Sequence, residues 1–276
     1  LIESNQTDKD GNLIHLYTND AEQQFSYIEA AKSKGYDVLL FDEQLDIHLA
    51  SKLEQKNEKN RYVRVDADIV DKLILKDDKS TVSLSSDDQQ ALSEVFRSQT
   101  PKQDKLNFLV TFDAIGADAY PVMITQDEFM RRMKEMAAMQ GGMMGFYGSM
   151  PDSYNLVVNT DHELVKSLLE EEKSSCSKAV KPKNDEIETL RKKVDELNTA
   201  NKDKKQDEIP EAEKEIIKTS NERISQLEKE KSEIYSKFAD GNDKVRQLID
   251  LALLANNMLK GEALSKFVKR STTFIK

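Results

Sequence analysis

The stretch from residue 183 to residue 240 restricts the fold of this chain more than any other part. Asp, Glu, Lys and Arg make up 29 of its 58 residues, so it cannot form a globular core of its own. Apolar residues nevertheless recur every three or four positions in two tracts, 187–197 and 217–238, which is typical of heptad helices. Pro210 lies between the tracts and would disrupt a helix interior. The pattern predicts two antiparallel helices in a hairpin that pack mainly on each other and present solvated charged faces.

Residues 1–75 alternate between strand and helix patterns. The segment 36–41 is a near-continuous apolar run, as expected for a strand buried on both faces of a parallel sheet. Asp20 is a good helix cap and Gly35 a good helix stop. The alternation predicts a small parallel α/β unit with right-handed crossovers, followed by a polar linker over 76–86. The predicted strands are 12–17, 36–41 and 61–65, and the predicted helices are 20–34 and 42–55.

Residues 87–180 carry a different pattern, which predicts an α+β domain. A methionine-rich helix, 126–140, lies between two of its strands. Thr160 or Asp161 is expected to cap a later helix that ends near Glu172. The other predicted elements are a helix over 86–99 and strands over 105–112, 120–125 and 154–159.

The chain turns apolar again after Asp243. Its apolar residues surround the predicted helix instead of lying along one face, which implies burial on every side. The domain's own sheet can cover one side, and a second copy of the chain is expected to cover the other. Gly261 separates this helix from a second one, so two such pairs would form a C-terminal helix bundle with an isologous interface. The predicted dimerisation residues are Leu248, Leu251, Leu254, Met258, Leu259, Phe267 and Phe274.

Seven of the nine methionines fall within residues 128–150. On a helical wheel Met130, Met133 and Met136 share one arc with Phe129. Charged residues fill the opposite arc, namely Glu128, Arg131, Lys134 and Glu135. Such a face is either core or an exposed patch that binds partners through adaptable side chains. The apolar loop that follows favours the exposed patch, because loops run over surfaces. The candidate binding residues are Phe129, Met130, Met133, Met136, Met139, Met143, Met144, Phe146 and Tyr147.

Charge and composition exclude several functions. A net charge of -10 argues against binding to nucleic acid or to an anionic membrane surface. No apolar run approaches the roughly 20 residues of a membrane span, and no signal peptide is visible. Cys176 is the only cysteine, which fits a reducing, cytoplasmic location, and its polar neighbours predict an exposed thiol. The first residues lack an initiator methionine and resemble a cut point, which predicts a fragment.

No catalytic motif is present in the sequence. It contains no P-loop, GxGxxG, HExxH or CxxC, and neither strand end of the α/β unit offers a phosphate site. The histidines at 15, 48 and 162 are far apart and are expected to be structural or exposed. We therefore expect neither an enzyme nor a bound metal or cofactor in these residues.

Four segments resemble the ninety-kilodalton heat shock protein chaperones, and most closely their bacterial branch. "SKGYDVLLFDEQLDIHLASKLEQ" (33–55) is similar to the end of their middle domain, and the segment 105–136 to the start of their C-terminal domain. "YNLVVNTDHELVKSLL" (154–169) resembles the strand and helix that follow. The segment 248–275, which contains "ALLA", resembles their dimerisation helices. Residues 180–240 have no equivalent in the common bacterial pattern and are interpreted as an insertion.

The resemblance implies a function. Residues 1–80 would be the last α/β/α sandwich of the middle domain, and residues 85–276 the α+β dimerisation domain with the inserted hairpin. The chain would form a homodimer and contact unfolded or partly folded client proteins through the methionine-rich segment. ATP and Mg would belong to the full-length chaperone, through an N-terminal ATPase domain outside these residues. The alternative is a structural coiled-coil adaptor, in which 183–240 is the working surface and the methionine face is core.

Overall fold

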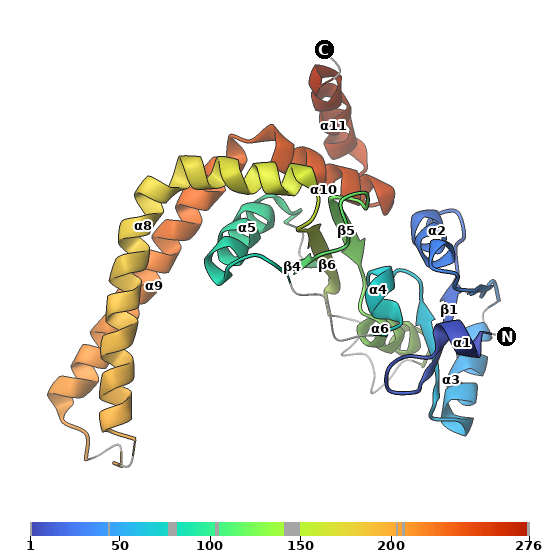
Figure 1. Cartoon of the computed structure of the whole chain (residues 1–276), viewed down its shortest axis with the longest axis horizontal. Coiled ribbons are helices and arrows are strands. Elements are labelled where there is room, and N and C mark those ends of the chain that lie inside the picture. Colours follow the sequence, from blue (N-terminus) through green and yellow to red (C-terminus); the bar gives the residue numbers. More distant parts are fainter. Residues whose placement is uncertain are drawn as a thin grey trace. The chain divides into compact units, whose positions relative to one another are not determined.

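The computed structural model describes residues 2–43, 45–76, 82–102, 105–140, 150–202, 204–205 and 208–274. The chain divides into two compact units (Figure 1). Unit 1 consists of Leu1–Ser85, Thr100–Lys166 and Arg246–Lys276, and it contains all the strands of the described residues. Unit 2 consists of Ser86–Gln99 and Ser167–Val245, and it is helical.

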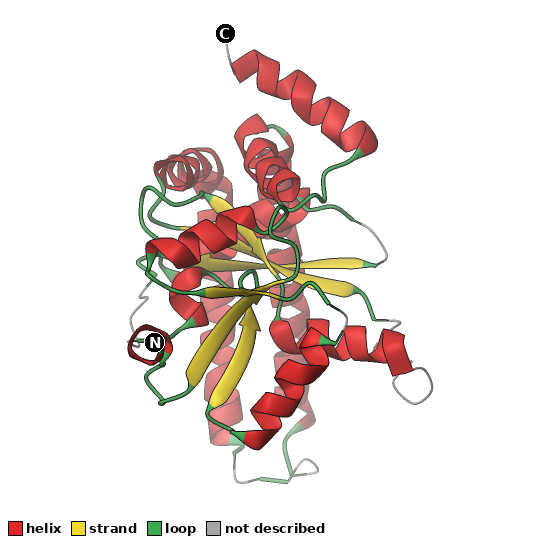
Figure 2. Ribbon diagram, turned by 90° about the vertical axis from the view of Figure 1, so that its right-hand side faces the viewer, coloured by secondary structure: helices red, strands yellow, loops and turns green. Residues whose placement is uncertain are grey.

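The first sheet of unit 1 has three parallel strands in the order β2-β1-β3. These are β1 (Leu13–Thr18), β2 (Val38–Leu40) and β3 (Asn60–Arg64), which confirms the three predicted strands and their parallel pairing. Helices flank the strands of this unit in Figure 2. The helices of this segment are α1 (Glu3–Gln6), α2 (Phe25–Ser33), α3 (Asp46–Lys56) and α4 (Val70–Leu73).

Successive side chains of β1 point to opposite faces of this sheet and build a core on each. Ile14 and Leu16 pack with residues of α2, whereas Tyr17 packs with Ala50 of α3. Helix α2 begins at Phe25, later than predicted, and Asp20 serves the turn before it, where its Oδ1 accepts the backbone N–H groups of residues 22 and 23 at 3.1 and 2.9 Å. The helix stops at Gly35, which has a φ of 75° that favours glycine. Gly35 therefore acts as expected, whereas the prediction that Asp20 caps this helix is wrong.

The second sheet of unit 1 has the order β4-β6-β5 and is mixed. β4 (Leu106–Asp113) runs parallel to β6 (Asp152–Asn159), and β5 (Val122–Thr125) runs antiparallel to it. Helix α6 (Glu128–Gln140) follows β5, as the methionine pattern predicts. Strand β6 is buried at its C-terminal end, from Leu156 to Asn159, and forms the centre of this core.

Unit 2 contains α5 (Ser86–Gln99), most of α8 (Glu163–Ala200) and α9 (Glu211–Asp240). The prediction that the helix after β6 ends near Glu172 is wrong. Helix α8 is 38 residues long, includes Pro182 in its interior and bends along its length (Figure 1). A proline in a helix interior costs about 3 kcal/mol. Burial of Val180 and Ile187 on either side of it offsets this, at about 1.5–3 kcal/mol for each side chain.

The start of α8 also differs from the prediction. His162 takes the capping position, since its Nδ1 accepts the backbone N–H of Leu164 at 3.1 Å. Thr160 and Asp161 serve the preceding loop instead. The hydroxyl of Thr160 donates to the Asp113 carbonyl at 3.2 Å, and a carboxylate oxygen of Asp161 accepts the Gly116 N–H at 3.0 Å.

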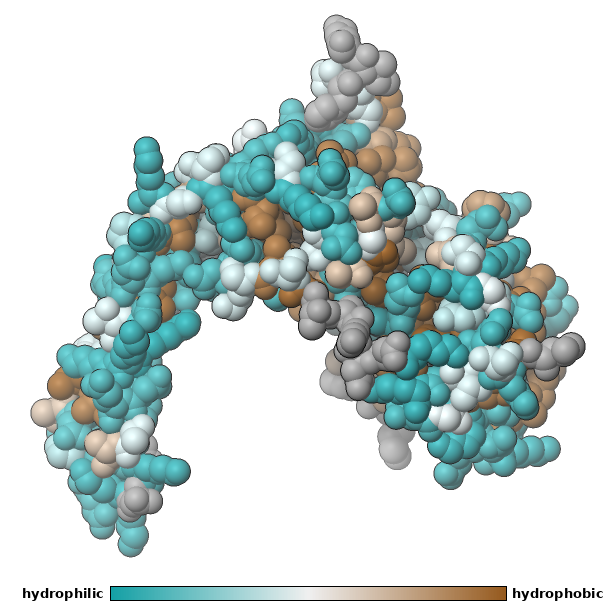
Figure 3. All heavy atoms as spheres, viewed as in Figure 1, coloured by the Kyte–Doolittle hydropathy of each residue, from teal (hydrophilic) through white to brown (hydrophobic). Residues whose placement is uncertain are grey.

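Helices α8 and α9 form the predicted antiparallel hairpin. Ion pairs join them at several levels, including Arg223 with Glu186 at 2.7 Å and Arg191 with Glu228 at 3.1 Å. Most of the hairpin surface is hydrophilic in Figure 3. Helix α9 also contacts α5, where the hydroxyl of Ser232 donates to Glu94 at 2.7 Å. The base of the hairpin is thus supported by a third helix, which buries Ala91, Leu92, Val95 and Phe96.

The prediction of an exposed thiol at Cys176 is wrong. Its side chain is only 2% exposed and lies in the core of unit 2. Burial, reinforced by the neighbouring Glu172 carboxylate, raises the pKa of the thiol to about 11. Cys176 is therefore a small core residue of α8 and not a surface nucleophile.

The chain ends in α10 (Asp243–Ala255) and α11 (Gly261–Phe274). The turn between them contains Asn257, which has a φ of 56°, and Gly261, at 58°, begins the second helix. Polar contacts tie the two helices together. Nε of Arg270 donates to Oε1 of Gln247 at 3.0 Å, and its Nη2 lies 2.5 Å from Oδ2 of Asp250. A C-terminal pair of helices separated at Gly261 is thus present as predicted.

Candidate functional site

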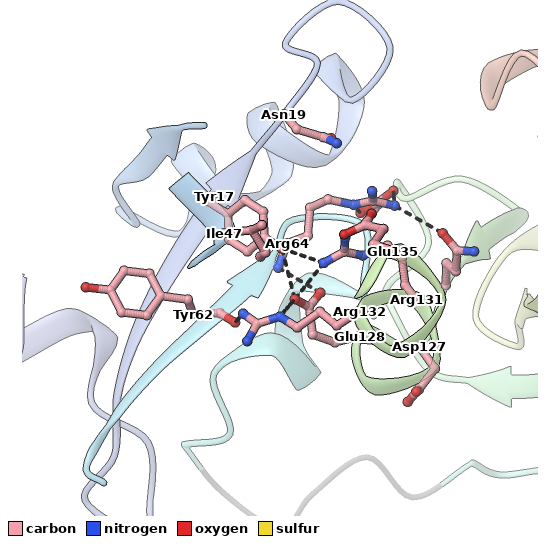
Figure 4. A network of polar contacts seen from close by, with 12 residues as sticks. Tyr17, Asn19, Ile47, Tyr62, Arg64, Asp127, Glu128, Arg131, Arg132 and Glu135 are labelled. Carbon is pink, nitrogen blue, oxygen red and sulfur yellow. Dashed lines mark hydrogen bonds and ion pairs between the residues drawn. The ribbon is translucent and has the colours of Figure 1, made fainter. Parts of the chain in front are cut away.

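The charged side of α6 attaches this helix to the first sheet of unit 1 (Figure 4). Glu128 is the centre of the network, because its Oε1 accepts from Tyr17 at 2.9 Å, from Arg131 at 2.7 Å and from Arg132 at 2.6 Å. Arg132 extends the network to Glu54 of α3 at 2.9 Å. Arg131 also donates to the hydroxyl of Tyr17 and lies 2.5 Å from Glu135. The polar arc of the helical wheel is therefore the attached side of α6.

Burial makes this network strong. Arg131 is 5% exposed, and Tyr17 is 2% exposed. Burial is the main cause that raises the pKa of the Tyr17 hydroxyl above its ordinary value, and the charge of Glu128 is the second. Burial alone would lower the pKa of Arg131, but the charges of Glu128 and Glu135 outweigh it and raise that pKa. Both side chains hold their usual protonation states at neutral pH, so the attachment of α6 persists over the physiological range.

The apolar arc of α6 begins with an exposed aromatic residue. Phe129 is 64% exposed, whereas Met130 and Met133 are half-buried. Ala137 is buried, and Lys134 is paired with Asp152 of β6 at 2.5 Å. Met136 and Met139 belong to α6, but their side chains lie outside the described residues, as do Met143, Met144, Phe146 and Tyr147. The candidate binding surface is thus described at Phe129, Met130 and Met133.

Helices α10 and α11 carry the second predicted surface. Leu248, Leu259 and Phe267 are buried within the single chain, and Met258 is half-buried. Leu251 is 44% exposed and Leu254 is 41% exposed. Val268 on α11 is 53% exposed, and the side chain of Phe274 lies outside the described residues. Three of the seven predicted residues are therefore buried in the single chain, one is half-buried, and two, Leu251 and Leu254, are open on α10.

Sequence reasoning missed the residues that hold α6. Tyr17, Glu54 and Tyr62 come from two strands and a helix far from α6 in the chain, and Tyr62 accepts a hydrogen bond from Arg132 at its carbonyl oxygen. One signal was available within α6 itself. Glu128 precedes Arg131 and Arg132 by three and four residues, a spacing at which side chains on a helix meet.

The described residues contain no group of three or more His, Cys, Asp or Glu side chains that could hold a metal ion. His15 stacks on Tyr62 with ring centroids 4.6 Å apart, and His48 is exposed on α3. With His162 at the start of α8, the three histidines lie in separate places. Among the described helices, none combines the length and hydropathy needed to cross a membrane.

Comparison with known proteins identifies relatives along the whole chain. The chain is 53% identical over 275 residues to the chaperone protein HtpG of Bacteroides thetaiotaomicron, and the match covers 100% of the chain and 40% of that protein. An HtpG of Bacteroides fragilis is 54% identical over 275 residues with the same coverage. HtpG of Porphyromonas gingivalis is 43% identical over 271 residues, which covers 98% of the chain and 40% of that protein. No family model matches the chain.

The chain therefore spans about 40% of the length of the relatives that it matches. The match with the Bacteroides thetaiotaomicron protein covers 100% of the chain, and so includes residues 180–240, the segment that the sequence resemblance left without an equivalent. These relatives confirm the resemblance to the ninety-kilodalton chaperones. Over the stretch that it spans, the chain belongs to the HtpG chaperone family.

Proposed function

We propose that this chain is the client-contacting and dimerising part of an ATP-dependent chaperone of the HtpG type, which assists protein folding. Residues 1–80 would supply the end of the middle domain, and residues 85–276 the C-terminal dimerisation domain. ATP and Mg would be bound by parts of the whole protein outside these 276 residues. The partners would be a second copy of the chain and unfolded or partly folded proteins, in the cytoplasm.

The attachment of α6 carries the proposal for client contact. An amphipathic helix in a globular protein usually turns its apolar face to the core and its charged face to water. Helix α6 instead buries Arg131 against Tyr17 and leaves Phe129 64% exposed. An aromatic side chain that is held outward by a buried ionic network is suited to contact apolar segments of other proteins. Half-buried methionines beside it provide side chains that repack against varied partners.

The exposed side of α10 supports the proposal of a homodimer. Leu248 and Ile249 cover the chain's own core, while Leu251 and Leu254 on the same helix are open. A helix that is apolar on both sides is stable in water only when both sides are covered. A twofold-related copy of the same helix would cover the open side with identical residues.

Aggregation of an unfolded protein tests client contact. Phe129→Ser should weaken suppression of aggregation of a heat-denatured model protein, with little change in the thermal midpoint of the chain, since Phe129 is 64% exposed. Leu109→Ser is the matched control, because Leu109 on β4 is 60% exposed. The control should suppress aggregation as the parent chain does. Equal suppression by the parent and Phe129→Ser would contradict the proposal, and a large drop in midpoint would show that Phe129 supports the core.

A further inference from the structure

A groove in unit 1 runs from α2 across the loop before β5 to α10. It consists of two cavities, of about 820 and 310 Å³. The two are continuous because both are lined by Tyr27 of α2, by Tyr120 and Pro121 of the loop, and by Met123 of β5. The smaller cavity ends at Leu251 and Leu254 of α10. The groove is separate from the exposed face of α6.

Large apolar side chains along this groove are open to solvent. Phe25 is 61% exposed and Tyr120 is 58% exposed, although both line cavities. At the α10 end, Leu251 is 44% and Leu254 is 41% exposed. Single exposed apolar residues are common on proteins, but several along one concave surface mark a binding site.

The unpaired charges of the larger cavity are negative. Glu29 and Asp118 line it, and neither forms an ion pair or side-chain hydrogen bond with any of the described residues. The single lysine of the lining, Lys34, is paired with Asp71 at 2.7 Å. His162, also in the lining, uses Nδ1 to accept the backbone N–H of Leu164. The groove therefore favours a partner that brings positive charge.

The walls of the groove are fixed before any partner arrives. Buried Asn159 holds the loop, since its Nδ2 donates to the carbonyls of Gly116 at 2.8 Å and Tyr120 at 3.3 Å. Its Oδ1 accepts the N–H of Ile115 at 3.2 Å. The hydroxyl of Tyr27 anchors α2, because it lies 2.5 Å from the Ile124 carbonyl and 3.0 Å from Oδ1 of Asn256. A preformed surface loses little entropy on binding.

We propose that the larger cavity of this groove binds a segment of another polypeptide in which apolar side chains alternate with Lys or Arg. The apolar side chains would lie on Phe25 and Tyr120, and the cations would face Glu29 and Asp118. Leu251 and Leu254, which line only the smaller cavity, belong to the proposed dimer interface. The open carboxylates disfavour phosphate and nucleic acid. A second copy of the chain, with a net charge of -10, is also a poor match for this rim. The inference rests on the proposed chaperone role only in taking the segment from a client.

A tryptophan introduced into the groove provides a direct measurement, because the chain contains none. In Tyr120→Trp the indole replaces a largely exposed ring, and the backbone bond to Asn159 is kept. We expect its fluorescence to change on titration with a short synthetic peptide of alternating Leu and Lys. A twin peptide with Glu in place of Lys should give no change, and added salt should weaken the response to the Lys peptide.

Second substitutions in the Tyr120→Trp background locate the binding. The double substitution Glu29→Gln and Asp118→Asn should weaken the affinity for the Lys peptide about tenfold, because it removes two exposed ion pairs. The control pair Asp42→Asn and Glu58→Gln makes the same charge change at exposed sites elsewhere. Phe25→Ser should abolish the response.

Phe129→Ser is the control for the aromatic change, since the two phenylalanines are 61% and 64% exposed. It should leave the response intact, which separates this site from the α6 surface and its aggregation assay. Equal binding of both peptides, or unchanged binding by the groove variants, would overturn the proposal. A fluorescence change that depends on protein concentration alone would assign the groove to a second copy of the chain, and would also overturn the proposal.

Discussion

The hydroxyl of Tyr17 on β1 lies 2.9 Å from Oε1 of Glu128 on α6, and the same oxygen accepts hydrogen bonds from Arg131 and Arg132. One carboxylate oxygen therefore accepts hydrogen bonds from a strand and from the next turn of its own helix. Arg131 is buried, so its charge is tolerated only because Glu128 and Glu135 neutralise it. The orientation of α6, and with it the exposure of Phe129, depends on this group of charges.

Glu128→Gln should therefore destabilise the chain. Removing one partner of a buried ion pair leaves the other charge uncompensated and costs about 3 kcal/mol. For a chain of this size that loss lowers the thermal midpoint by roughly 6–12 °C. Glu188→Gln is the control, because Glu188 pairs with Lys192 in the same i,i+4 manner with both side chains exposed. The midpoint of the control should hardly move, and equal midpoints for the two variants would show that the network does not hold α6.

Leu254→Glu should convert a dimer into a monomer in light scattering at micromolar concentration. The physical reason is that a charge buried in an apolar interface without a partner prevents association. Leu75→Glu is a matched control, since Leu75 is also 41% exposed but lies outside α10 and α11. It should remain dimeric. A parent chain that is monomeric at this concentration would contradict the proposed interface.

The strands could be predicted because their patterns are local. A near-continuous apolar run at 36–41 and alternation at 12–17 each predicted a strand of the first sheet. The expected burial of 36–41 on both faces is wrong, because β2 is an edge strand in which Leu39 and Leu40 are exposed. The network around Glu128 could not be found in this way, because Tyr17 is 111 residues away and a tyrosine in a strand is an ordinary core residue. Which arc of an amphipathic helix is buried depends on what it packs against, and that information is not local.

The error at α8 has a different cause. The sequence analysis predicted a helix end near Glu172, before Pro182, and the polar neighbours of Cys176 predicted an exposed thiol. Residues 168, 172, 176 and 180 nevertheless recur every four positions and are all buried. The stripe continues to Ile187 beyond the proline. Continuity of a stripe on both sides of a proline is therefore a better sign of one bent helix than the proline is of a boundary.

The tip of the hairpin should be dispensable. Its ion pair between Lys214 and the exposed Glu211 contributes little, whereas the base of α9 packs on α5, where Phe96 is buried. Replacing residues 196–217 with a short glycine linker should leave the urea unfolding midpoint of the chain nearly unchanged. Removing 183–240 entirely would uncover α5, and this larger deletion should aggregate. Aggregation of the smaller deletion would show that the tip supports the rest of unit 2.

Glu172 provides a test of stability against pH. Its side chain is 4% exposed, and burial raises the pKa of its carboxyl above the ordinary value, with a further contribution from the charge of Asp88. The folded chain therefore holds this proton more tightly than the unfolded chain does. As the pH rises above the unfolded pKa of about 4.3, the unfolded chain loses the proton first, so the free energy of unfolding falls. The fall ends once the pH has passed the folded pKa.

Glu172→Gln removes this dependence because the amide stays neutral and its carbonyl can still accept the Cys176 thiol. The variant should have a higher urea midpoint than the parent at pH 7, and the difference should vanish below the unfolded pKa, where both side chains are neutral. Glu170→Gln is the control, since Glu170 is exposed on the same helix, and it should follow the parent at every pH. A lower midpoint for Glu172→Gln at pH 7 would mean that Lys173 stabilises the buried carboxylate more than burial penalises it.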